Sequence, residues 1–240
     1  MTTHFAHRGS LTEAPENTIP SFERALNRKT RAIELDVQLS KDGELVICHD
    51  QRINRVAKGK KGFIKDFTLA ELKQMDLGAS FSEEYEGTSF ATLEEVLAIC
   101  PPDILLNIEI KNTPIPYEGI EKKVMDCLKG HKRMDNVIIS SLDHLVLKRI
   151  RELNAGIKIG MLFQDRILEP WDYAQRSGLD VYSLHPRYLF VDETYVKKSH
   201  EAGLYVYPWT VDGTDDLDRL LKAGVDGVFT NNPGFFGTTE

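Results

Sequence analysis

Apolar and amphipathic stretches alternate along the chain from one end to the other. Eight apolar stretches are typical of strands, and they lie at 3–8, 32–39, 104–111, 136–141, 158–163, 180–185, 204–210 and 227–230. Helical patterns lie between them, for example at 17–26, 143–153, 193–203 and 214–224. The last two of these end in glycine, which commonly stops a helix in a left-handed conformation. This alternation with short connections predicts a parallel α/β barrel of eight units.

One segment interrupts the alternation after the second strand. The turn KDG leads into a further short strand at 44–49, which we expect to pair back on the second strand as a hairpin. Residues 51–103 then form an excursion with two helical pieces, at 68–75 and 92–100. We interpret residues 51–103 as a loop insertion over the barrel mouth, so that residues 1–240 form a single domain.

Composition and charge narrow the class of protein. The chain has 240 residues, 41% of them apolar and 28% charged, as in ordinary soluble globular proteins. Its net charge of −7 argues against a general binder of nucleic acid or anionic membranes. Cys48, Cys100 and Cys127 lack CxxC spacing and are odd in number, so we expect neither a zinc site nor a disulfide framework. No signal peptide or membrane-spanning stretch is visible, and we expect a cytoplasmic location.

Polar side chains gather at the carboxyl ends of the predicted strands, where barrel enzymes place their chemistry. They are His7, Arg8, Glu34, Asp36, Glu109, Lys111, Ser140, Ser141, His185, Trp209, Thr230 and Asn231. His49 and Asp50 follow the hairpin strand in the same way. We therefore expect these side chains to meet at the mouth of the barrel.

Three of these residues, Glu34, Asp36 and Glu109, have the chemistry of metal ligands. A strand points every second side chain to one face, so Glu34 and Asp36 project together. Carboxylates without a cysteine ligand favour Ca²⁺, Mg²⁺ or Mn²⁺ over structural zinc. A salt bridge is the commoner fate of any single acid, such as Glu109 with Lys111. Because crowded acids are costly without a cation, we predict a divalent-cation site.

Two histidines, His7 and His49, are the candidates for proton transfer. Imidazole titrates near neutral pH, so one ring can accept a proton while another donates one. Each of the two lies at a strand end beside another charged residue. His185 in SLHP is open between a substrate contact and a third proton carrier. The remaining histidines are explained by helix, loop or terminal positions, and they are His4, His131, His144 and His200.

Positive charge for a phosphate group comes from Arg8, which can form bidentate hydrogen bonds, and from Lys111, a compact charge. Asn17 has two interpretations of equal weight. It either caps the helix that follows or orients His7 or the anion. Trp209 either packs against the alcohol portion of the substrate or closes the barrel top as an aromatic plug. The whole set indicates a metal-dependent phosphodiesterase.

Short motifs in a fixed order resemble those of a known family. HRG followed by APENT, then ELDV, CHD, NIEIK, PWTV and DGVFTNNP, are similar to the signature series of the glycerophosphodiester phosphodiesterases. The similarity runs from residue 4 to residue 233 and includes FTLAELKQMDLGASF and TLEEVL in the excursion. Any one motif is weak evidence, but the ordered set is highly specific.

The resemblance implies a TIM barrel, (β/α)8, that hydrolyses a small-molecule glycerophosphodiester to glycerol 3-phosphate and an alcohol, with Ca²⁺ or Mg²⁺. Carried over by motif, His7 and His49 are the acid/base pair, while Arg8 and Lys111 hold the phosphate. The implied metal ligands are Glu34, Asp36 and Glu109. Two mechanisms stay open: attack by the glycerol 2-hydroxyl through a cyclic phosphate, or direct attack by water.

The chain departs from the usual family motifs in four places. These are Ala91, RVAKGK (55–60), TVDG (210–213) and TNNP (230–233). We expect none of them to touch a proposed metal ligand or proton carrier. We expect them to shape the loops at the mouth and hence the choice of alcohol.

Three other functions stay open. A lysophospholipase D-like or sphingomyelinase D-like phosphodiesterase needs an apolar groove, for which the excursion offers Phe63, Phe67, Phe81, Tyr85 and Phe90. A Schiff-base aldolase would use Lys111 and needs a lysine of depressed pKa. A noncatalytic barrel would bind phosphate esters without turnover. The combination of metal ligands and proton carriers favours hydrolysis over these alternatives.

Overall fold

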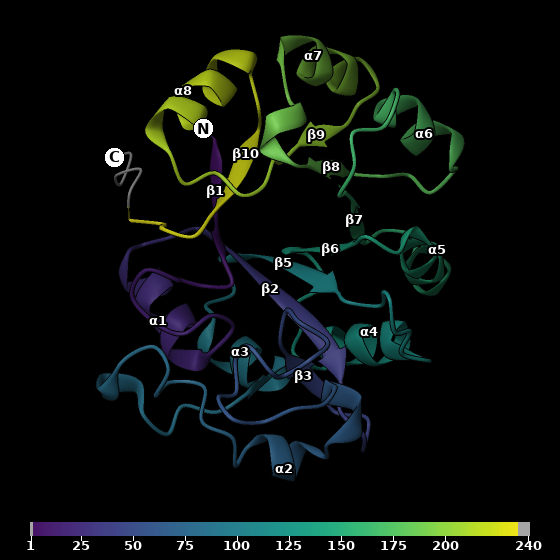
Figure 1. The fold of residues 1–240 in the computed structure, drawn as a ribbon. Coiled ribbons are helices and arrows are strands. Elements are labelled where there is room, and N and C mark those ends of the chain that lie inside the picture. The colour runs from purple at the N-terminus through teal and green to yellow at the C-terminus, as the bar shows by residue number, and fades with distance from the viewer. Residues whose placement is uncertain (1, 235–240) are drawn as a thin grey trace.

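The computed structural model describes residues 2–234 and contains a parallel sheet with helices around it (Figure 1). The strands are β1 (Thr3–His7), β2 (Ala32–Leu39), β3 (Leu45–Ile47), β4 (Ala91–Thr92), β5 (Leu105–Ile110), β6 (Val137–Ser141), β7 (Lys158–Phe163), β8 (Ser183–Pro186), β9 (Tyr205–Val206) and β10 (Gly227–Thr230). The helices are α1 (Ile19–Asn27), α2 (Leu69–Leu72), α3 (Leu93–Ile99), α4 (Ile120–Gly130), α5 (His144–Leu153), α6 (Pro170–Arg176), α7 (Glu193–Glu201) and α8 (Thr214–Ala223). Three short 3₁₀ helices are η1 (Ile64–Asp66), η2 (Glu83–Tyr85) and η3 (Tyr188–Phe190).

The main sheet has the order β10-β1-β2-β5-β6-β7-β8-β9, and all neighbours in it are parallel. Backbone hydrogen bonds also join β10, at one end of this order, to the segment that follows β9, at the other end. The N–H of Phe229 donates to the carbonyl of Pro208 at 3.0 Å, and that of Val211 donates to the carbonyl of Phe229 at 2.8 Å. The strands therefore form the TIM barrel that the sequence predicts.

The predicted strand boundaries hold best where the chain is buried on both faces. The structure has strands at 32–39, 158–163 and 227–230, as predicted. The strand predicted at 204–210 is too long, because only Tyr205–Val206 is a strand. Pro208 lies in that segment and has no N–H for the ladder, which explains the early end.

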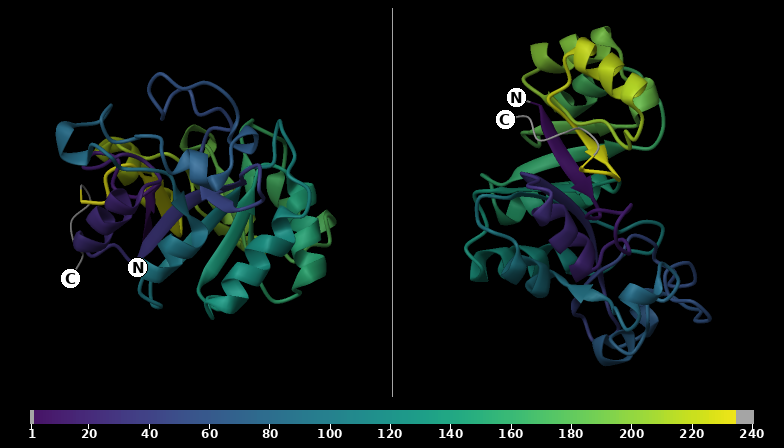
Figure 2. Two further views of the ribbon diagram at one scale, coloured as in Figure 1. Left: turned by 90° about the horizontal axis from the view of Figure 1, so that it is seen from below. Right: turned by 90° about the vertical axis from the view of Figure 1, so that its left-hand side faces the viewer.

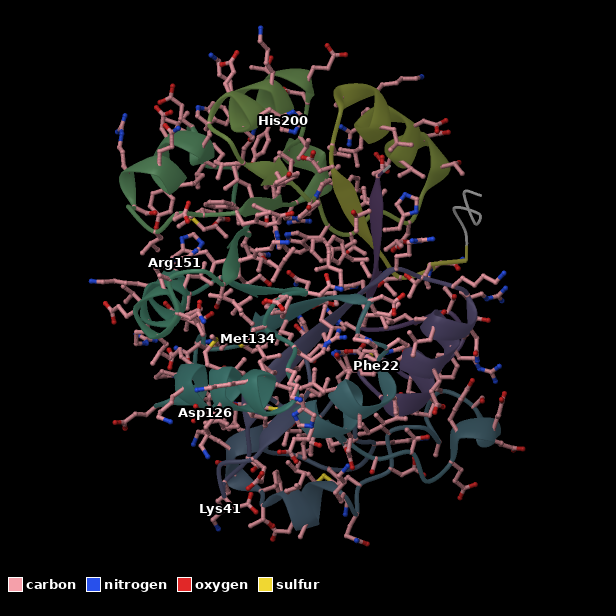
Figure 3. The ribbon with its side chains drawn as sticks, turned by 180° about the vertical axis from the view of Figure 1, so that it is seen from behind. Phe22, Lys41, Asp126, Met134, Arg151 and His200 are labelled. Carbon is pink, nitrogen blue, oxygen red and sulfur yellow. The ribbon has the colours of Figure 1, made fainter. Side chains whose placement is uncertain are left out.

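The core lies between the strands and the ring of helices. β2 is buried along its whole length, as expected for a parallel strand covered on both sides. Its apolar side chains pack in the largest core cluster together with Phe22 of α1. In Figure 3, Phe22 lies inside the molecule, while Asp126 of α4 and Arg151 of α5 lie at the periphery. The acidic side chains of β2 alternate with the apolar ones and so face the barrel interior.

The excursion has a core of its own. β3 pairs antiparallel with β2, which confirms the predicted hairpin. A second cluster of buried residues consists of Val46, Cys48, Ile53, Ala57, Ile64, Leu72, Met75, Leu77 and Phe90. The excursion lies at the opposite end of the molecule from α7 and α8 (Figure 2).

The helical piece predicted at 92–100 has a different place from the one we expected. The structure has α3 there, and its buried residues Leu93, Val96 and Leu97 belong to the main core and not to the core of the excursion. α3 also contacts α1. It therefore packs beside α1 on the main core, and it does not lie over the mouth. In residues 2–234, we find no helix with the length and apolar character that a membrane span requires.

Candidate active site

The sheet register brings the predicted site residues together. His7 lies opposite Glu34 in the β1–β2 pair, and Asp36 lies opposite Glu109 in the β2–β5 pair. Glu34 also lies opposite Asn107. Because the strands are parallel, these positions fall at one level near the same end of the barrel. A side-chain alternation visible in the sequence thus becomes a cluster in space.

Three buried carboxylates form a group that can hold a cation. Glu34, Asp36 and Glu109 each offer an oxygen atom, and these atoms lie within 4.8 Å of one another. The Oδ1 atom of Asp36 is buried and accepts no hydrogen bond from the described residues. Buried oxygen atoms are rarely left without a partner, so an oxygen-binding divalent cation fits this place.

The titration behaviour of the carboxylates reflects their crowding. Burial, together with Asp36 and Glu109, raises the pKa of Glu34 well above its ordinary value. Burial would also raise the pKa of Asp36, but the positive charges of His49, Lys111 and Arg8 outweigh it and lower that pKa. The group therefore contains one carboxyl that gains a proton easily and one that stays ionised.

Two cations border the carboxylates. The Nζ atom of Lys111 lies 2.6 Å from Oε1 of Glu109 and 3.6 Å from Oδ1 of Asp36. The Nε atom of Arg8 lies 3.4 Å from Oδ2 of Asp36. Burial lowers the pKa of Lys111, but Glu109 and Asp36 outweigh burial and raise it overall. Both cations are charged and can attract an anionic group to the cavity.

The HRG motif makes a tight turn after β1. Arg8 has a φ of 55°, and its backbone N–H donates to Oε2 of Glu34 at 2.9 Å. Gly9 follows with a φ of 91°, and a Cβ atom there would collide with Ser21. The turn thus needs glycine for both its conformation and its close contact with α1.

His7 is a buried histidine with an amide partner. Its Nδ1 atom lies 2.7 Å from Oδ1 of Asn231, and its Nε2 atom lies 3.9 Å from Oε2 of Glu34. Burial, and then the charge of Arg8, lowers the pKa of His7 to about 4. At neutral pH this imidazole is therefore uncharged and able to accept a proton.

His49 has a carboxylate partner. Its Nδ1 atom lies 2.7 Å from Oδ1 of Asp50, whose Oδ2 accepts a hydrogen bond from Nε of Arg55 at 2.7 Å. The hydrogen bond with His49 is the largest cause of a lowered Asp50 pKa, and Arg55 adds to it. Arg55 also donates two hydrogen bonds to Glu16, which in turn accepts one from Arg8 at 3.2 Å.

These contacts correct one expectation from the sequence. We expected the departures from the family motifs to touch no proton carrier. Asn231 of TNNP bonds directly to His7, and Asp212 of TVDG bonds to Asn231. Arg55 of RVAKGK holds the carboxylate partner of His49. The expectation was wrong because loops that are far apart in the sequence supply the side chains that hold the two histidines.

Asn17 does not cap α1. Thr18 is the N-cap, since its side chain accepts a hydrogen bond from the backbone N–H of Ser21. The side chain of Asn17 donates to Oδ2 of Asp36 at 2.8 Å and accepts from the backbone N–H of Asp36 at 3.3 Å. The side-chain partner of Asn17 is thus Asp36 and not His7, so Asn17 orients a carboxylate of the acidic group.

His185 and Trp209 line the cavity on the other side of the barrel. His185 is fully buried, and burial lowers its pKa to about 3. Its Nε2 atom lies 2.8 Å from Oγ of Ser183, while the indole N–H of Trp209 donates to its carbonyl oxygen at 2.8 Å. A Cβ atom on Gly160 would collide with the His185 ring. His185 is therefore a neutral residue of the cavity wall, and its Nε2 atom is already engaged by Ser183, which favours a wall contact over a third proton carrier.

One cavity of about 280 Å³ contains most of the predicted residues. Its lining residues are His7, Arg8, Glu34, His49, Asn107, Glu109, Lys111, Leu142, Leu162, Gln164, His185, Trp209 and Phe229. Ser140, Ser141 and Thr230 are not among them. Sequence reasoning missed Asn107, which precedes Glu109 by two residues and faces the same way.

Asn107 donates to Oγ of Ser140 at 2.9 Å, and its own Oδ1 is buried without a partner among the described residues. The same period of two that revealed the carboxylates could have revealed Asn107.

Three of the other histidines have structural partners. His131 bonds to the carbonyl of Cys127, His144 bonds to that of Leu162, and His200 pairs with Asp226 on the outside of the molecule (Figure 3).

The mouth combines an acidic group for a cation, two charges for an anion and two imidazoles for proton transfer. Cleavage of a phosphoric diester can use all three, because charge develops on the phosphate oxygens while protons move on and off the attacking and leaving oxygens. The fold and the site together define a barrel phosphodiesterase.

Comparisons with known proteins agree with this class. The model of the glycerophosphoryl diester phosphodiesterase family matches residues 7–235, and the chain belongs to this family. A glycerophosphodiester phosphodiesterase of Caldanaerobacter subterraneus subsp. tengcongensis is 43% identical over 95% of this chain and 93% of its own length. A glycerophosphodiester phosphodiesterase of Bacillus subtilis is 34% identical over 96% and 84%, respectively.

Solved structures show the same fold. A phosphodiesterase of Oleispira antarctica, in complex with the product sn-glycerol 3-phosphate, has a TM-score of 0.88 and is 32% identical. The alignment covers 98% of this chain and 94% of that one. The glycerophosphodiester phosphodiesterase of Thermotoga maritima has a TM-score of 0.78 at 28% identity and covers 98% and 97%.

Proposed function

We propose that this chain hydrolyses glycerophosphodiesters to sn-glycerol 3-phosphate and an alcohol, with a divalent cation held by Glu34, Asp36 and Glu109. The observation that carries the proposal is the single cavity in which His7 and His49 lie beside two of these carboxylates and both phosphate-binding cations. The Oleispira antarctica relative, which binds that product, supports the substrate class.

Each side chain has a defined task in this reaction. Arg8 and Lys111 bind the nonbridging oxygens of the phosphate, and His7 and His49 move protons to and from the attacking and leaving oxygens. When bound, the cation withdraws charge from the phosphate and supplies Lewis-acid chemistry. Asn17 keeps the Asp36 carboxylate in place, and its task is therefore to orient a ligand and not to bind phosphate.

The substrate alcohol faces the wall made by His185 and Trp209. Both line the cavity, and both are already hydrogen-bonded, His185 through Nε2 to Ser183 and Trp209 through its indole N–H to the carbonyl of His185, so they act through shape and hydrogen bonding. The predicted cytoplasmic location and the single-domain organisation remain part of the proposal.

The alternatives receive less support from the geometry. Three of the five excursion aromatics proposed for an acyl groove are engaged elsewhere: Phe90 is fully buried, Tyr85 is 7% exposed, and the guanidinium of Arg52 lies 4.1 Å from the ring centre of Phe63. Phe81 is 43% exposed. A Schiff-base lysine needs a lowered pKa, whereas that of Lys111 is raised.

The test is the release of glycerol 3-phosphate from glycerophosphocholine and glycerophosphoethanolamine. The protein is stripped with EDTA and then given Ca²⁺, Mg²⁺ or Mn²⁺ in separate reactions. We expect activity to disappear with EDTA and to return with at least one cation. Full activity after EDTA would contradict the cation site, and no turnover with any cation would contradict the substrate class.

If glycerophosphodiesters fail, the same assay with micellar lysophospholipids distinguishes the lysophospholipase D-like alternative. Tight binding of a phosphate ester without turnover would indicate the noncatalytic barrel. Glu34→Gln and Glu109→Gln are the matched variants, because each keeps the shape of the side chain and removes one negative ligand. Both should weaken cation binding, and unchanged affinity in both would remove these residues as ligands.

A further inference from the structure

A chain of three side chains runs from the surface to His7. Asp212, which is exposed on the loop before α8, accepts two hydrogen bonds from Asn231. The backbone N–H of Asn231 donates to Oδ1 of Asp212 at 2.8 Å, and its side-chain amide donates to Oδ2 at 2.6 Å. Oδ1 of Asn231 then lies 2.7 Å from Nδ1 of His7.

The chemistry of the three groups decides where each proton lies. An ionised carboxylate only accepts hydrogen bonds, so the end of Asn231 that meets Asp212 must be the NH₂ group. The opposite end, which meets His7, must then be the carbonyl oxygen, which also only accepts. Nδ1 of His7 therefore carries a proton, and in the neutral ring Nε2 is left with a lone pair.

We propose that Asp212 is a positioning residue for His7, which acts through Asn231 to select the tautomer whose Nε2 accepts a proton. This inference rests on the proposed function for its catalytic meaning. Rotation of the Asn231 amide would present NH₂ to Nδ1 of His7 and require the opposite tautomer. Asp212 prevents the rotation because its carboxylate would then face the amide oxygen.

The Asn231 amide also determines how much negative charge lies next to His7. A carboxylate placed directly on Nδ1 would stabilise a positive ring. Asn231 passes on the orientation of Asp212 without placing a full negative charge against His7. His7 is thereby kept in one orientation and one tautomer.

The kinetic test begins with Asp212→Asn, whose new amide can present either end to Asn231. Loss of an outer hydrogen-bond partner typically costs about 10–100-fold, and we expect a decrease of that size in kcat for glycerophosphocholine. KM and cation affinity should stay near wild type, because Arg8, Lys111 and the carboxylates are untouched. Asp215→Asn on α8 makes the same charge change at another exposed carboxylate and should have no effect.

A double variant makes the test specific to the proposed arrangement. Asn231→Asp alone places two carboxylates face to face and should also lower kcat. Asp212→Asn combined with Asn231→Asp again allows one amide–carboxylate bond, with an acceptor facing Nδ1 of His7. We expect the double variant to recover the His7 tautomer that Asp212→Asn loses, and its kcat–pH profile to shift to higher pH because a carboxylate now contacts Nδ1 of His7. A double variant whose His7 ring is as mixed in tautomer as in Asp212→Asn would overturn the proposal.

The tautomer can be observed without any turnover. Long-range ¹H–¹⁵N NMR spectra distinguish the two ring nitrogens, and His7→Gln identifies the signals of His7. We expect a protonated Nδ1 and a bare Nε2 in the wild type, and a mixture of tautomers in Asp212→Asn. A wild-type ring protonated on Nε2 would overturn the proposal. If the chain failed to hydrolyse glycerophosphodiesters, this spectrum would still decide the inference, so the two failures are distinguishable.

Discussion

The two histidines of the cavity are placed by different parts of the molecule. His7 ends β1, its side chain is 13% exposed, and it bonds to an amide from the loop after β10. His49 follows β3 at the edge of the excursion, is 32% exposed, and bonds to a carboxylate that Arg55 holds. A neutral partner suits a ring that accepts a proton, whereas an anionic partner stabilises a ring that carries one.

This difference between the two histidines indicates that they have different roles in proton transfer. The His7 side is built from the end of β1 and from the two loops that carry Asn231 and Asp212. The His49 side depends on a loop with its own small core, and its charge network extends through Glu16 to Arg8. We infer that His7 is the proton acceptor and His49 the donor in the first step.

The largest expected effect comes from removal of either ring. His7→Ala and His49→Ala should each lower kcat by about 10²–10⁴-fold, since general acid or base catalysis contributes that much. His200→Ala, which removes an exposed ring paired with Asp226, is the control and should keep wild-type activity. The comparison is made from steady-state rates on glycerophosphocholine with circular dichroism as a check on folding. Near-normal rates in both cavity variants would refute the acid/base pair.

A smaller effect is expected on cation binding, because protons and the cation compete for the Glu34 carboxylate beside His7. The pKa of Glu34 is raised, so in the cation-free protein this carboxyl holds a proton at a pH where an ordinary glutamate is ionised. A cation must displace that proton, and affinity should therefore rise by about tenfold per pH unit until Glu34 is fully ionised.

Calorimetry of Mg²⁺ or Ca²⁺ binding to EDTA-treated protein, from pH 5 to pH 7, measures this dependence. The use of buffers with different ionisation enthalpies also counts the protons released. Asp36 should contribute none, because its pKa is lowered and it is ionised throughout. Equal affinity at both ends of the pH range would show that Glu34 is not a ligand or is already ionised.

The contrast between residues placed by strands and residues placed by loops explains what the sequence could and could not predict. Glu34, Asp36 and Glu109 were predictable because strand alternation and parallel register are local, regular rules. The partners of the histidines were not, because Asn231 lies 224 positions from His7 and the contact depends on how two loops end.

The boundaries of the strands and helices show the same limit of prediction from sequence. The buried strand at 32–39 was predicted in full, whereas the segment at 204–210 leaves the strand conformation near Pro208. The helical pattern at 92–100 was visible, but not that its apolar face packs on the barrel core. Periodicity predicts an element and its buried face, yet it does not say which of two cores the face joins.

The smallest expected effect concerns the link between the excursion and His49. Arg55→Ala removes the hydrogen bonds to Asp50 and Glu16, and we expect about a tenfold decrease in kcat because Asp50 is then free to rotate away from His49. Arg55→Lys keeps the charge but lacks the planar fork that binds two carboxylates together, so it should recover only part of the activity. Arg52→Ala removes an arginine of the same loop that stacks on Phe63, and it should leave kcat unchanged. If Arg55→Ala matched the wild type, the orientation of His49 would depend on Asp50 alone, and the two sides of the cavity would differ only in the charge of their partners.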